Sequence, residues 1–497
     1  MKSLILVFLT ASTLFAYPVI LKESKELPLT VFNVTFRVGS ADDAKDTAGI
    51  ANLTAGLLEE GGVKAYEGLP KRSREEIQEF LFPLAASIEV SASKEQTSIR
   101  VSCTAENADT LFDLLTQMIL APEFSDSELD RLKSEAKDVL EKRLPLEDQE
   151  ELGKAALERS IYGADHPYSH VLAGTSQGVA KINKEMIENF YKTHFTQKKL
   201  TVAAGGVISD SVKKKLGTVF LKLPVGTDAK AFIPKATPKA KMNLVIVTGP
   251  FDSTGVHLGI SQPVTRNSTD FPAMNLGSMA FGKHRSFVGR LMKTVREIRG
   301  LNYGAYSYIE EFPNGGHSLV PPNQVSRQLQ AFTMWARPTT VPNGCFLLKQ
   351  IIREFDNIST KGLTEAEFQL GKGHLTGVIP LLGTVLSRQI GYAIDSNFYG
   401  IEGDFLSNLQ RANDKLTRKE VNAALAKNLS NGKPTVVVVT KDAAAFLKEL
   451  KSGQCPIHYP DGVKKEKSVL AEDVLISKYP IAVDEKEIQV VSSKDFF

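Results

Sequence analysis

The sequence has few cysteines and no excess of either charge, and each shortage excludes a class of protein. Its three cysteines, Cys103, Cys345 and Cys455, are odd in number and widely spaced, so they do not predict a small fold built on disulfides. Lysine and arginine number 60 against 57 aspartate and glutamate, which gives a net charge of +3. This balance predicts no basic face, and we therefore expect no nucleic-acid partner.

A long apolar run is also missing beyond the N-terminus. Residues 1–16 combine Lys2, an apolar core and the small residue Ala16, a pattern typical of a secretory signal peptide. No later stretch of 18 or more apolar residues follows, so we expect no membrane anchor after signal cleavage. The mature chain is predicted to be exported, to a periplasm or to the outside of the cell.

What the sequence does contain is a long internal repeat. A cap residue, a helical stretch and a buried strand begin at Asn183 and recur at Thr417. Positions 182 and 416, and positions 201 and 435, are both 234 residues apart. A second pair of capped helix starts, at 124–133 and 363–372, is 239 residues apart. Periods of this size indicate duplicated domains rather than a solenoid of short repeats.

The repeat divides the chain into five parts. These are a signal peptide (1–16), an N-terminal domain (17–221), a linker (222–242), a C-terminal domain (243–440) and an extension (441–497). The linker is rich in Pro, Ala and Lys, which predicts an exposed, extended segment. Within each half, strands and helices mix and some strands are adjacent, as in hairpins. We predict an α+β fold of two homologous α/β-sandwich domains, with helices on one face of each sheet.

One helix near the start has the frame of a zinc-peptidase helix without its chemistry. In the inverted motif H-x-x-E-H, two histidines four residues apart hold Zn²⁺ and a glutamate between them activates water. The matching positions here are Asn52, Ala55 and Gly56. Catalytic zinc normally needs three protein ligands, and alanine and glycine supply neither a ligand nor a base. We therefore predict no metal site in this chain.

The order of shorter motifs resembles the pitrilysin/insulinase family of inverted zinc metallopeptidases. In the first half the matching segments are 38–40, 49–51, 57–61, 122–124, 166–168 and 174–175; in the second half they are 290–291, 295–297, 299–301, 303 and 362–367. The resemblance implies a clam-shaped chamber of four homologous domains, which some members divide between two chains. This chain is similar to the noncatalytic member of such a pair and would form half of a peptidase chamber.

In that noncatalytic member an Arg and a Tyr lie seven residues apart in the second half, and Arg296 and Tyr303 match them in spacing and context. The resemblance implies that both side chains act catalytically in the partner's site, by reaching the substrate carbonyl at its zinc. A phenol hydroxyl and a guanidinium are donors suited to an oxyanion. Composition alone favours a surface arginine near a helix end and a half-buried strand aromatic.

Other candidate zinc ligands have simpler interpretations. His166 and His170 are four residues apart, but Pro167 between them disfavours a helix, so we predict loop histidines in a polar turn. Glu141 lies near the place of the family's third zinc ligand; without histidine companions it is interpreted as an acid on a helix surface. The segment 282–289 is less glycine-rich than the family's usual form.

The leading prediction is a noncatalytic subunit of an exported zinc metallopeptidase. It would pair with a zinc-bearing homologue to form a peptide-degrading chamber, with peptides as substrates, zinc in the partner and no cofactor in this chain. We expect no hydrolysis by the chain alone. The alternative is a peptide-binding or assembly protein of the same fold that has no role in proteolysis. A self-sufficient zinc enzyme would need ligands that the sequence does not contain.

Overall fold

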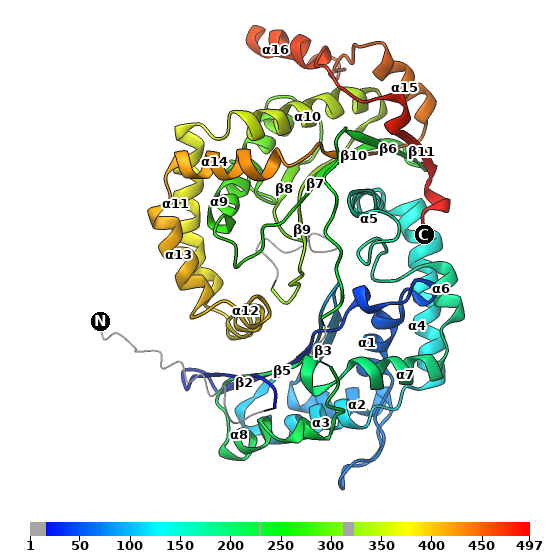
Figure 1. The fold of residues 1–497 in the computed structure, drawn as a ribbon, viewed down its shortest axis with the longest axis vertical. Helices are drawn as coiled ribbons and strands as arrows, with labels where there is room; N and C mark the ends of the chain where they lie inside the picture. Colours follow the sequence, from blue (N-terminus) through cyan, green and yellow to red (C-terminus); the bar gives the residue numbers. More distant parts are fainter. Residues whose placement is uncertain (1–15, 228–229, 312–322) are drawn as a thin grey trace.

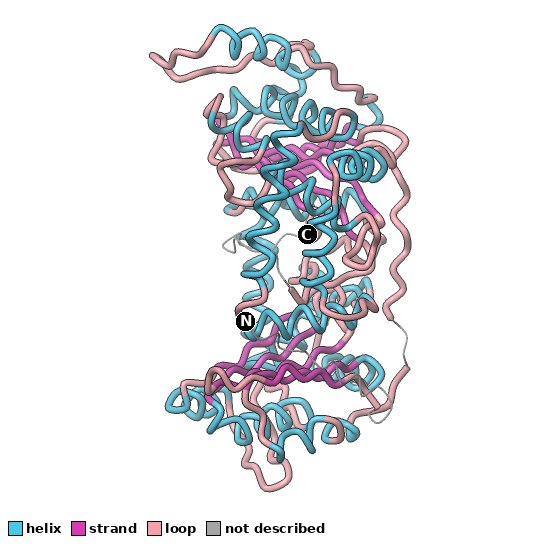
Figure 2. Tube along the Cα trace, turned by 90° about the vertical axis from the view of Figure 1, so that its left-hand side faces the viewer, coloured by secondary structure: helices cyan, strands magenta, loops and turns pink. Residues whose placement is uncertain are grey.

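The computed structural model describes residues 16–227, 230–311 and 323–497. Apart from Ala16, the predicted signal peptide lies outside the described residues. The described chain forms two lobes, each built on one sheet (Figures 1 and 2). Mixed helices and strands in two mixed sheets confirm the predicted α+β class.

The two sheets share one strand order. The first runs β1-β5-β2-β4-β3, and the second runs β6-β10-β7-β9-β8 with β11 added beside β6. In both, the corresponding pairs β1–β5 and β6–β10 are parallel, whereas the following pairs are antiparallel. The shared order confirms the predicted duplication. The strands are β1 (Val19–Glu23), β2 (Leu29–Phe36), β3 (Ser87–Ala92), β4 (Thr97–Thr104), β5 (Leu200–Gly206), β6 (Asn243–Thr248), β7 (Ser253–Gln262), β8 (Ala305–Tyr308), β9 (Gln330–Thr340), β10 (Thr435–Thr440) and β11 (Ile488–Ser492).

The helix caps predicted at Asn183, Thr417 and the start of 363–372 are present, whereas Ser125, at the predicted start in 124–133, makes no side-chain capping hydrogen bond. Asn183 accepts a hydrogen bond from the Met186 N–H at the start of α7, and Thr417 forms a capping box with Glu420 at the start of α14. The helices of the first half are α1 (Ile50–Glu60), α2 (Arg74–Leu81), α3 (Ala108–Leu120), α4 (Asp126–Asp138), the π-helix η5 (Val139–Glu147), α5 (Gln149–Tyr162), α6 (Ser176–Lys181), α7 (Lys184–His194) and α8 (Asp210–Leu216). Those of the second are α9 (Phe271–Gly282), the π-helix η8 (Met292–Glu297), α10 (Gly344–Thr360), α11 (Glu365–Leu382), α12 (Leu386–Tyr399), α13 (Phe405–Lys415), α14 (Arg418–Leu429), α15 (Ala443–Lys451) and α16 (Lys467–Ser477).

One helix from each half packs on the sheet of the other half. Helix α5, from the first half, packs on β7 and β10 of the second sheet, and α12, from the second half, packs on β5, β1 and β2 of the first sheet (Figure 1). In the α5 contact, Leu152 and Ala156 meet Val437 and Val439. In the α12 contact, Ile390 and Ile394 meet Val31 and Ala203.

This exchange corrects the expectation of helices on one face only. Along β10, Val436 and Val438 point into the main core of the second half, whereas Val437 and Val439 face α5. Because alternate side chains of a strand point to opposite faces, four consecutive buried valines require cover on both faces. The second cover comes from the other half, so the two lobes share apolar surface.

Buried charges also join the halves. Glu158 of α5 pairs with Lys94 of the first half at 3.1 Å and with Arg327 of the second half at 2.6 Å. Burial opposes ionisation of Glu158, but the two cations outweigh it and hold the pKa of this carboxyl below its usual value. Removing one member would leave an uncompensated buried charge, so the cluster favours this arrangement of the lobes.

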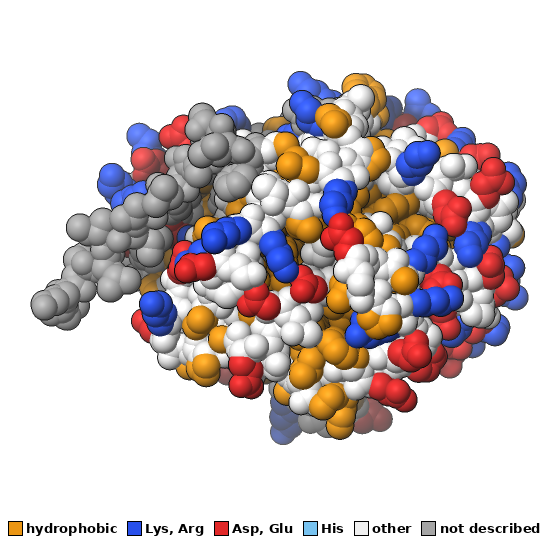
Figure 3. All heavy atoms as spheres, turned by 90° about the horizontal axis from the view of Figure 1, so that it is seen from below, with side chains coloured by type: hydrophobic (Ala, Val, Ile, Leu, Met, Phe, Trp, Pro, Cys, Tyr) orange, Lys and Arg blue, Asp and Glu red, His pale blue; other side chains and the backbone are white. Residues whose placement is uncertain are grey.

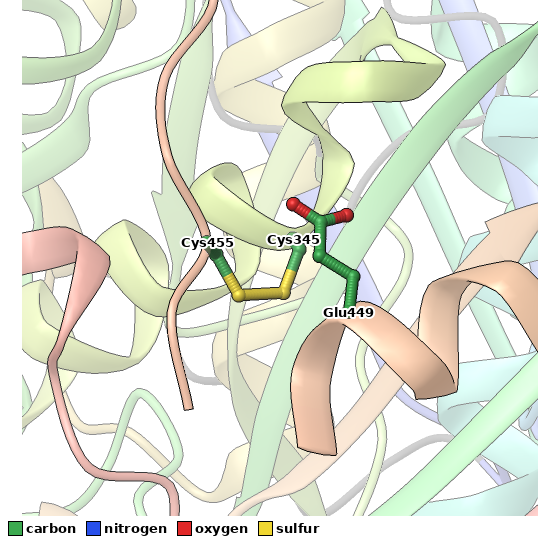
Figure 4. A group of neighbouring side chains, drawn as sticks. All are labelled: Cys345, Glu449 and Cys455. Carbon is green, nitrogen blue, oxygen red and sulfur yellow. A yellow bond between two sulfur atoms is a disulfide. The ribbon is translucent and has the colours of Figure 1, made fainter. Parts of the chain in front are cut away.

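The C-terminal extension is fixed to the second half in two ways. Strand β11 pairs in parallel with β6, and Cys455 forms a disulfide with Cys345 at the start of α10, as Figure 4 shows. The cysteine count alone did not predict this pairing. The remaining cysteine, Cys103, is buried, and burial raises the pKa of its thiol to about 11.

Charges of both signs share one face of the molecule. On the side shown in Figure 3, lysine and arginine intermix with aspartate and glutamate. Within the described ranges, no helix combines the length and the apolar character needed to cross a membrane. The linker is mostly exposed, and its Pro234 carbonyl lies 2.9 Å from Nε2 of His166.

Candidate functional site

Helix α1 carries the three positions of the lost zinc motif. It begins after Gly49, whose φ of 109° lies in the left-handed region that glycine tolerates. The carboxylate of Asp43 accepts hydrogen bonds from the N–H groups of Gly49 and Ala51, at 2.7 and 3.0 Å. These hydrogen bonds fix the start of α1, the helix that carries positions 52, 55 and 56.

The side chains on α1 do not fit a metal. Ala55 is buried, and a Cβ added to Gly56 would lie 3.0 Å from Cδ1 of Leu132 on α4. Leucine therefore packs where a side chain at position 56 would project. Glu141, on η5, is exposed. With no donor at positions 55 and 56, these residues cannot form the three-ligand set that catalytic zinc requires.

Elsewhere in the described part of the chain, three possible metal ligands lie close together. They are Cys345, Glu449 and Cys455 (Figure 4). The two sulfurs are joined to each other, so neither is a thiolate that could bind a metal. The group is a structural disulfide beside a carboxylate.

The two loop histidines, His166 and His170, contact neighbouring loop and backbone groups. His166 accepts a hydrogen bond from the Tyr168 N–H at Nδ1, and its Nε2 faces the Pro234 carbonyl, which assigns the proton to Nε2. Partial burial lowers the pKa of His166, although the contact with the Pro234 carbonyl opposes this. His170 lies 3.1 Å from the buried Asp43 carboxylate that caps α1. The structure thus agrees with their interpretation as turn residues.

The structure brings Arg296 and Tyr303 together. Arg296 lies on η8, and its Cζ atom is 4.5 Å from the centroid of the Tyr303 ring. Tyr303 precedes β8, and 62% of its surface is exposed. The Arg296 guanidinium also lies 4.9 Å from the ring centroid of Phe287, which is exposed as well. A cation and a phenol therefore share one accessible surface.

Two residues of this site were missed by the sequence analysis. Arg337, on β9, places its Cζ atom 5.1 Å from the Tyr303 ring centroid, and Glu150, on α5, accepts a hydrogen bond from Arg337 Nε at 2.7 Å. Neither is near Arg296 or Tyr303 in sequence. Only the exchange of α5 between the halves brings Glu150 to the site.

A cavity of about 270 Å³ lies between α5 and the second sheet. Trp335 and Lys154 line it, together with the Lys94–Glu158–Arg327 cluster. His257 of β7 also lines it and is 1% exposed, with neither ring nitrogen hydrogen-bonded within the described chain. Burial lowers the pKa of His257 to about 3, and Lys154 adds to the effect, so the ring is neutral.

These features define an inverted-zinc-peptidase fold whose zinc helix has lost its ligands. Residues 19–164 match the family described as "Insulinase (Peptidase family M16)", and residues 181–375 match "Peptidase M16 inactive domain". The chain therefore belongs to the M16, or insulinase, peptidase family, and it is an inactive homologue within it.

Known relatives cover most of the chain at low identity. A Helicobacter pylori protein named "Non-peptidase homolog YmxG" is 24% identical over 416 residues, which is 82% of this chain and 87% of the relative. A Mycobacterium tuberculosis protein named "Uncharacterized zinc protease Rv2782c" is 24% identical over 402 residues, 79% of this chain and 84% of the relative. The beta subunit of the mitochondrial-processing peptidase of Caenorhabditis elegans is 25% identical over 190 residues, 37% of this chain and 39% of that subunit.

Solved structures agree on the fold. A peptidase M16 inactive domain from Pseudomonas fluorescens superimposes with a TM-score of 0.73 at 23% identity, covering 86% of this chain and 97% of that one. A protease from Helicobacter pylori gives a TM-score of 0.69 at 16% identity, over 86% and 97% of the two chains.

Proposed function

We propose that the chain is the noncatalytic subunit of an exported two-chain zinc peptidase. In this proposal a homologue with an intact H-x-x-E-H motif supplies the zinc, and this chain supplies half of the chamber with Arg296 and Tyr303. The observation that carries the proposal is the pairing of an accessible phenol with a guanidinium 4.5 Å from its ring, in a chain whose own zinc helix has no ligands.

The free donors of the pair support a role toward a substrate. In the described residues Arg296 has no carboxylate partner, and the Tyr303 hydroxyl has no hydrogen-bond partner. Both groups can therefore donate to an external acceptor. A carbonyl oxygen that gains negative charge during hydrolysis is such an acceptor, and donors held in place for it stabilise the transition state more than the ground state.

Two further observations support a partner and an oxidising compartment. A named relative, the Caenorhabditis elegans protein, is itself a subunit of a processing peptidase. The Cys345–Cys455 disulfide favours a compartment where thiols are oxidised, in line with export.

A peptide-holding protein without proteolysis is the second candidate. The cavity beside α5 favours it, because Glu311 lines the cavity and its buried Oε2 atom lies 4.0 Å from Nη1 of Arg327 but has no hydrogen-bond partner in the described chain. Burial raises the pKa of Glu311. Such a group suits a ligand that brings its own donor.

Reconstitution separates the two candidates. The purified mature chain, a homologue with an intact H-x-x-E-H motif and an equimolar mixture are each tested for bound metal, for assembly by size-exclusion chromatography and for hydrolysis of a peptide library. We expect no zinc and no hydrolysis for the chain alone, a mixed complex, and more hydrolysis by the complex than by the homologue. Peptide binding by the chain with no effect on the homologue would favour the second candidate. One zinc per isolated chain, with hydrolysis that a chelator abolishes, would contradict both.

A further inference from the structure

The Arg296–Tyr303 pair belongs to a continuous stack in which cations alternate with aromatic rings. The Arg296 guanidinium lies over two rings, those of Phe287 and Tyr303, and the Tyr303 ring has two guanidiniums over it, those of Arg296 and Arg337. The stack continues inward because Arg337 is also 5.8 Å from the Trp335 ring, and Lys154 is 4.2 Å from it. From the surface inward, the order is Phe287, Arg296, Tyr303, Arg337, Trp335 and Lys154. All separations are within the range of cation–π attraction.

Arg337 is attached to the loop that carries Tyr303. Its backbone N–H donates to the Gly304 carbonyl at 2.9 Å, and its carbonyl accepts from the Asn302 side chain at 2.7 Å. These two bonds fix the residues on either side of Tyr303. The guanidinium of Arg337 then lies against the tyrosine ring itself. The exposed Tyr303 ring therefore has a guanidinium beside it whose own backbone is bonded to both of its neighbours.

The two guanidiniums around Tyr303 differ in their charge partners. Arg337 is paired with Glu150, whereas Arg296 has no carboxylate partner among the described residues. Pairing with Glu150 offsets one of two like charges that would otherwise repel across a single ring. It also fixes the planar guanidinium of Arg337 through a charge-assisted hydrogen bond. Arg296 keeps its charge available to an external anion.

We propose that Arg337 is a positioning residue for Tyr303 and that Glu150 orients Arg337. Through this contact α5, a helix of the first half, sets the geometry of a site that lies in the second half. The inference rests on the proposed function for its effect on turnover, but the position of the Tyr303 ring can be measured in the isolated chain. In this proposal Arg337 acts through Tyr303.

The first test uses the isolated chain. Tyrosine ring signals are recorded by NMR with selective labelling, and the Tyr303 signal is assigned by its loss in Tyr303→Phe. We expect Arg337→Gln and Glu150→Gln to move this signal toward the position of free tyrosine and Arg337→Lys to move it less, because lysine keeps the cation. Arg418→Gln, which removes an ion pair of 2.9 Å between α14 and Glu365 of α11, is the matched control and should leave the signal unchanged. Circular dichroism confirms that each variant is folded. An unchanged Tyr303 signal in folded Arg337→Gln would overturn the inference.

The second test uses the reconstituted complex. Misplacement of a catalytic group by about 1 Å can cost about 10²-fold in rate, so we expect Arg337→Gln to lower kcat by up to that factor with little change in KM. Arg337→Lys should recover part of the loss, and Arg418→Gln should lose nothing. If Tyr303→Phe has no effect on turnover, the proposed function fails, and the NMR result still decides the positioning. If Tyr303→Phe lowers turnover while Arg337→Gln and Glu150→Gln do not, the proposed function survives and the positioning role is refuted.

Discussion

Gly56 illustrates how the lost zinc helix has become a packing surface. A Cβ atom added at position 56 would lie only 3.0 Å from Cδ1 of Leu132. A histidine placed there would therefore press against the half-buried Leu132 side chain rather than enter an open metal site. Position 56 thus lacks a metal-binding side chain and also lies where α1 packs on α4.

We predict that Gly56→His lowers the free energy of unfolding by about 1–3 kcal/mol, the usual cost of overpacking, and restores no zinc. Gly377→His is the matched control, because Gly377 also lies within a helix but has open space around it. The control should be neutral or slightly stabilising, since glycine is a poor helix former. Chemical denaturation and metal analysis measure both effects. Equal stability of the two variants would refute this account of Gly56.

His257 makes stability depend on pH. Its pKa is about 3 in the folded chain, against an ordinary value of 6.5. Below pH 6.5 the unfolded chain binds a proton that the folded chain excludes, so the free energy of unfolding falls as pH falls, down to about pH 3. The expected contribution is about 1.4 kcal/mol per pH unit well below 6.5.

The test compares denaturation at pH 7.5 and 5.5. We predict that His257→Gln loses less stability between these values than the wild type does, because the glutamine does not titrate. His458→Gln changes an exposed histidine and controls for the substitution itself. Identical losses in the wild type and in His257→Gln would show that the His257 ring is not kept neutral by burial.

At the scale of the elements, local signals predicted most of the fold. The strands β2, β4 and β6 contain the apolar and β-branched residues that predict a strand from the local sequence alone. Caps such as Thr364 and Thr417 also formed as expected, because a cap is decided by residues three apart. Such features depend only on neighbouring residues.

The exchange of α5 and α12 could not be predicted in this way. The apolar residues of α5 predict a buried face, but the sequence of the helix does not specify which sheet packs against that face. The contact between Leu152 and Val437 joins residues far apart in the sequence. The same reason explains why Arg337 and Glu150 were missed at the site, whereas Arg296 and Tyr303 were found through their family spacing.

The exchange leads to a prediction for proteolysis. We expect limited proteolysis to cut first in the exposed linker near Lys222–Lys239, and we expect the two fragments to stay together afterwards. Burial of each large aliphatic side chain contributes about 1.5–3 kcal/mol, and both α5 and α12 would have to leave the opposite sheet for the fragments to part. Size-exclusion chromatography of the nicked chain, followed by denaturing gel electrophoresis, measures this. Fragments that elute separately would contradict the exchange of helices.

At the scale of the whole molecule, the two halves form one unit, and the accessible Arg296–Tyr303 pair lies in the second half. The shared helices and the Lys94–Glu158–Arg327 cluster fix one lobe against the other. The disulfide and β11 fix the extension to the second half. A rigid frame of this kind suits a subunit whose donors must meet a site on another chain, because positioning is the main contribution it can make.

The turnover of a Tyr303→Phe complex tests the central claim most directly. The variant removes only a hydroxyl, so the complex should assemble as before while hydrolysis falls by about 10²- to 10³-fold, as for loss of one oxyanion donor. Arg296→Ala should also lower turnover, and the double variant should lose less than the product of the single losses, because both side chains act on one group. Tyr66→Phe, which removes a phenol hydroxyl from the first half, is the control and should keep full activity. A Tyr303→Phe complex that assembles normally and cleaves peptides at the full wild-type rate would contradict the account.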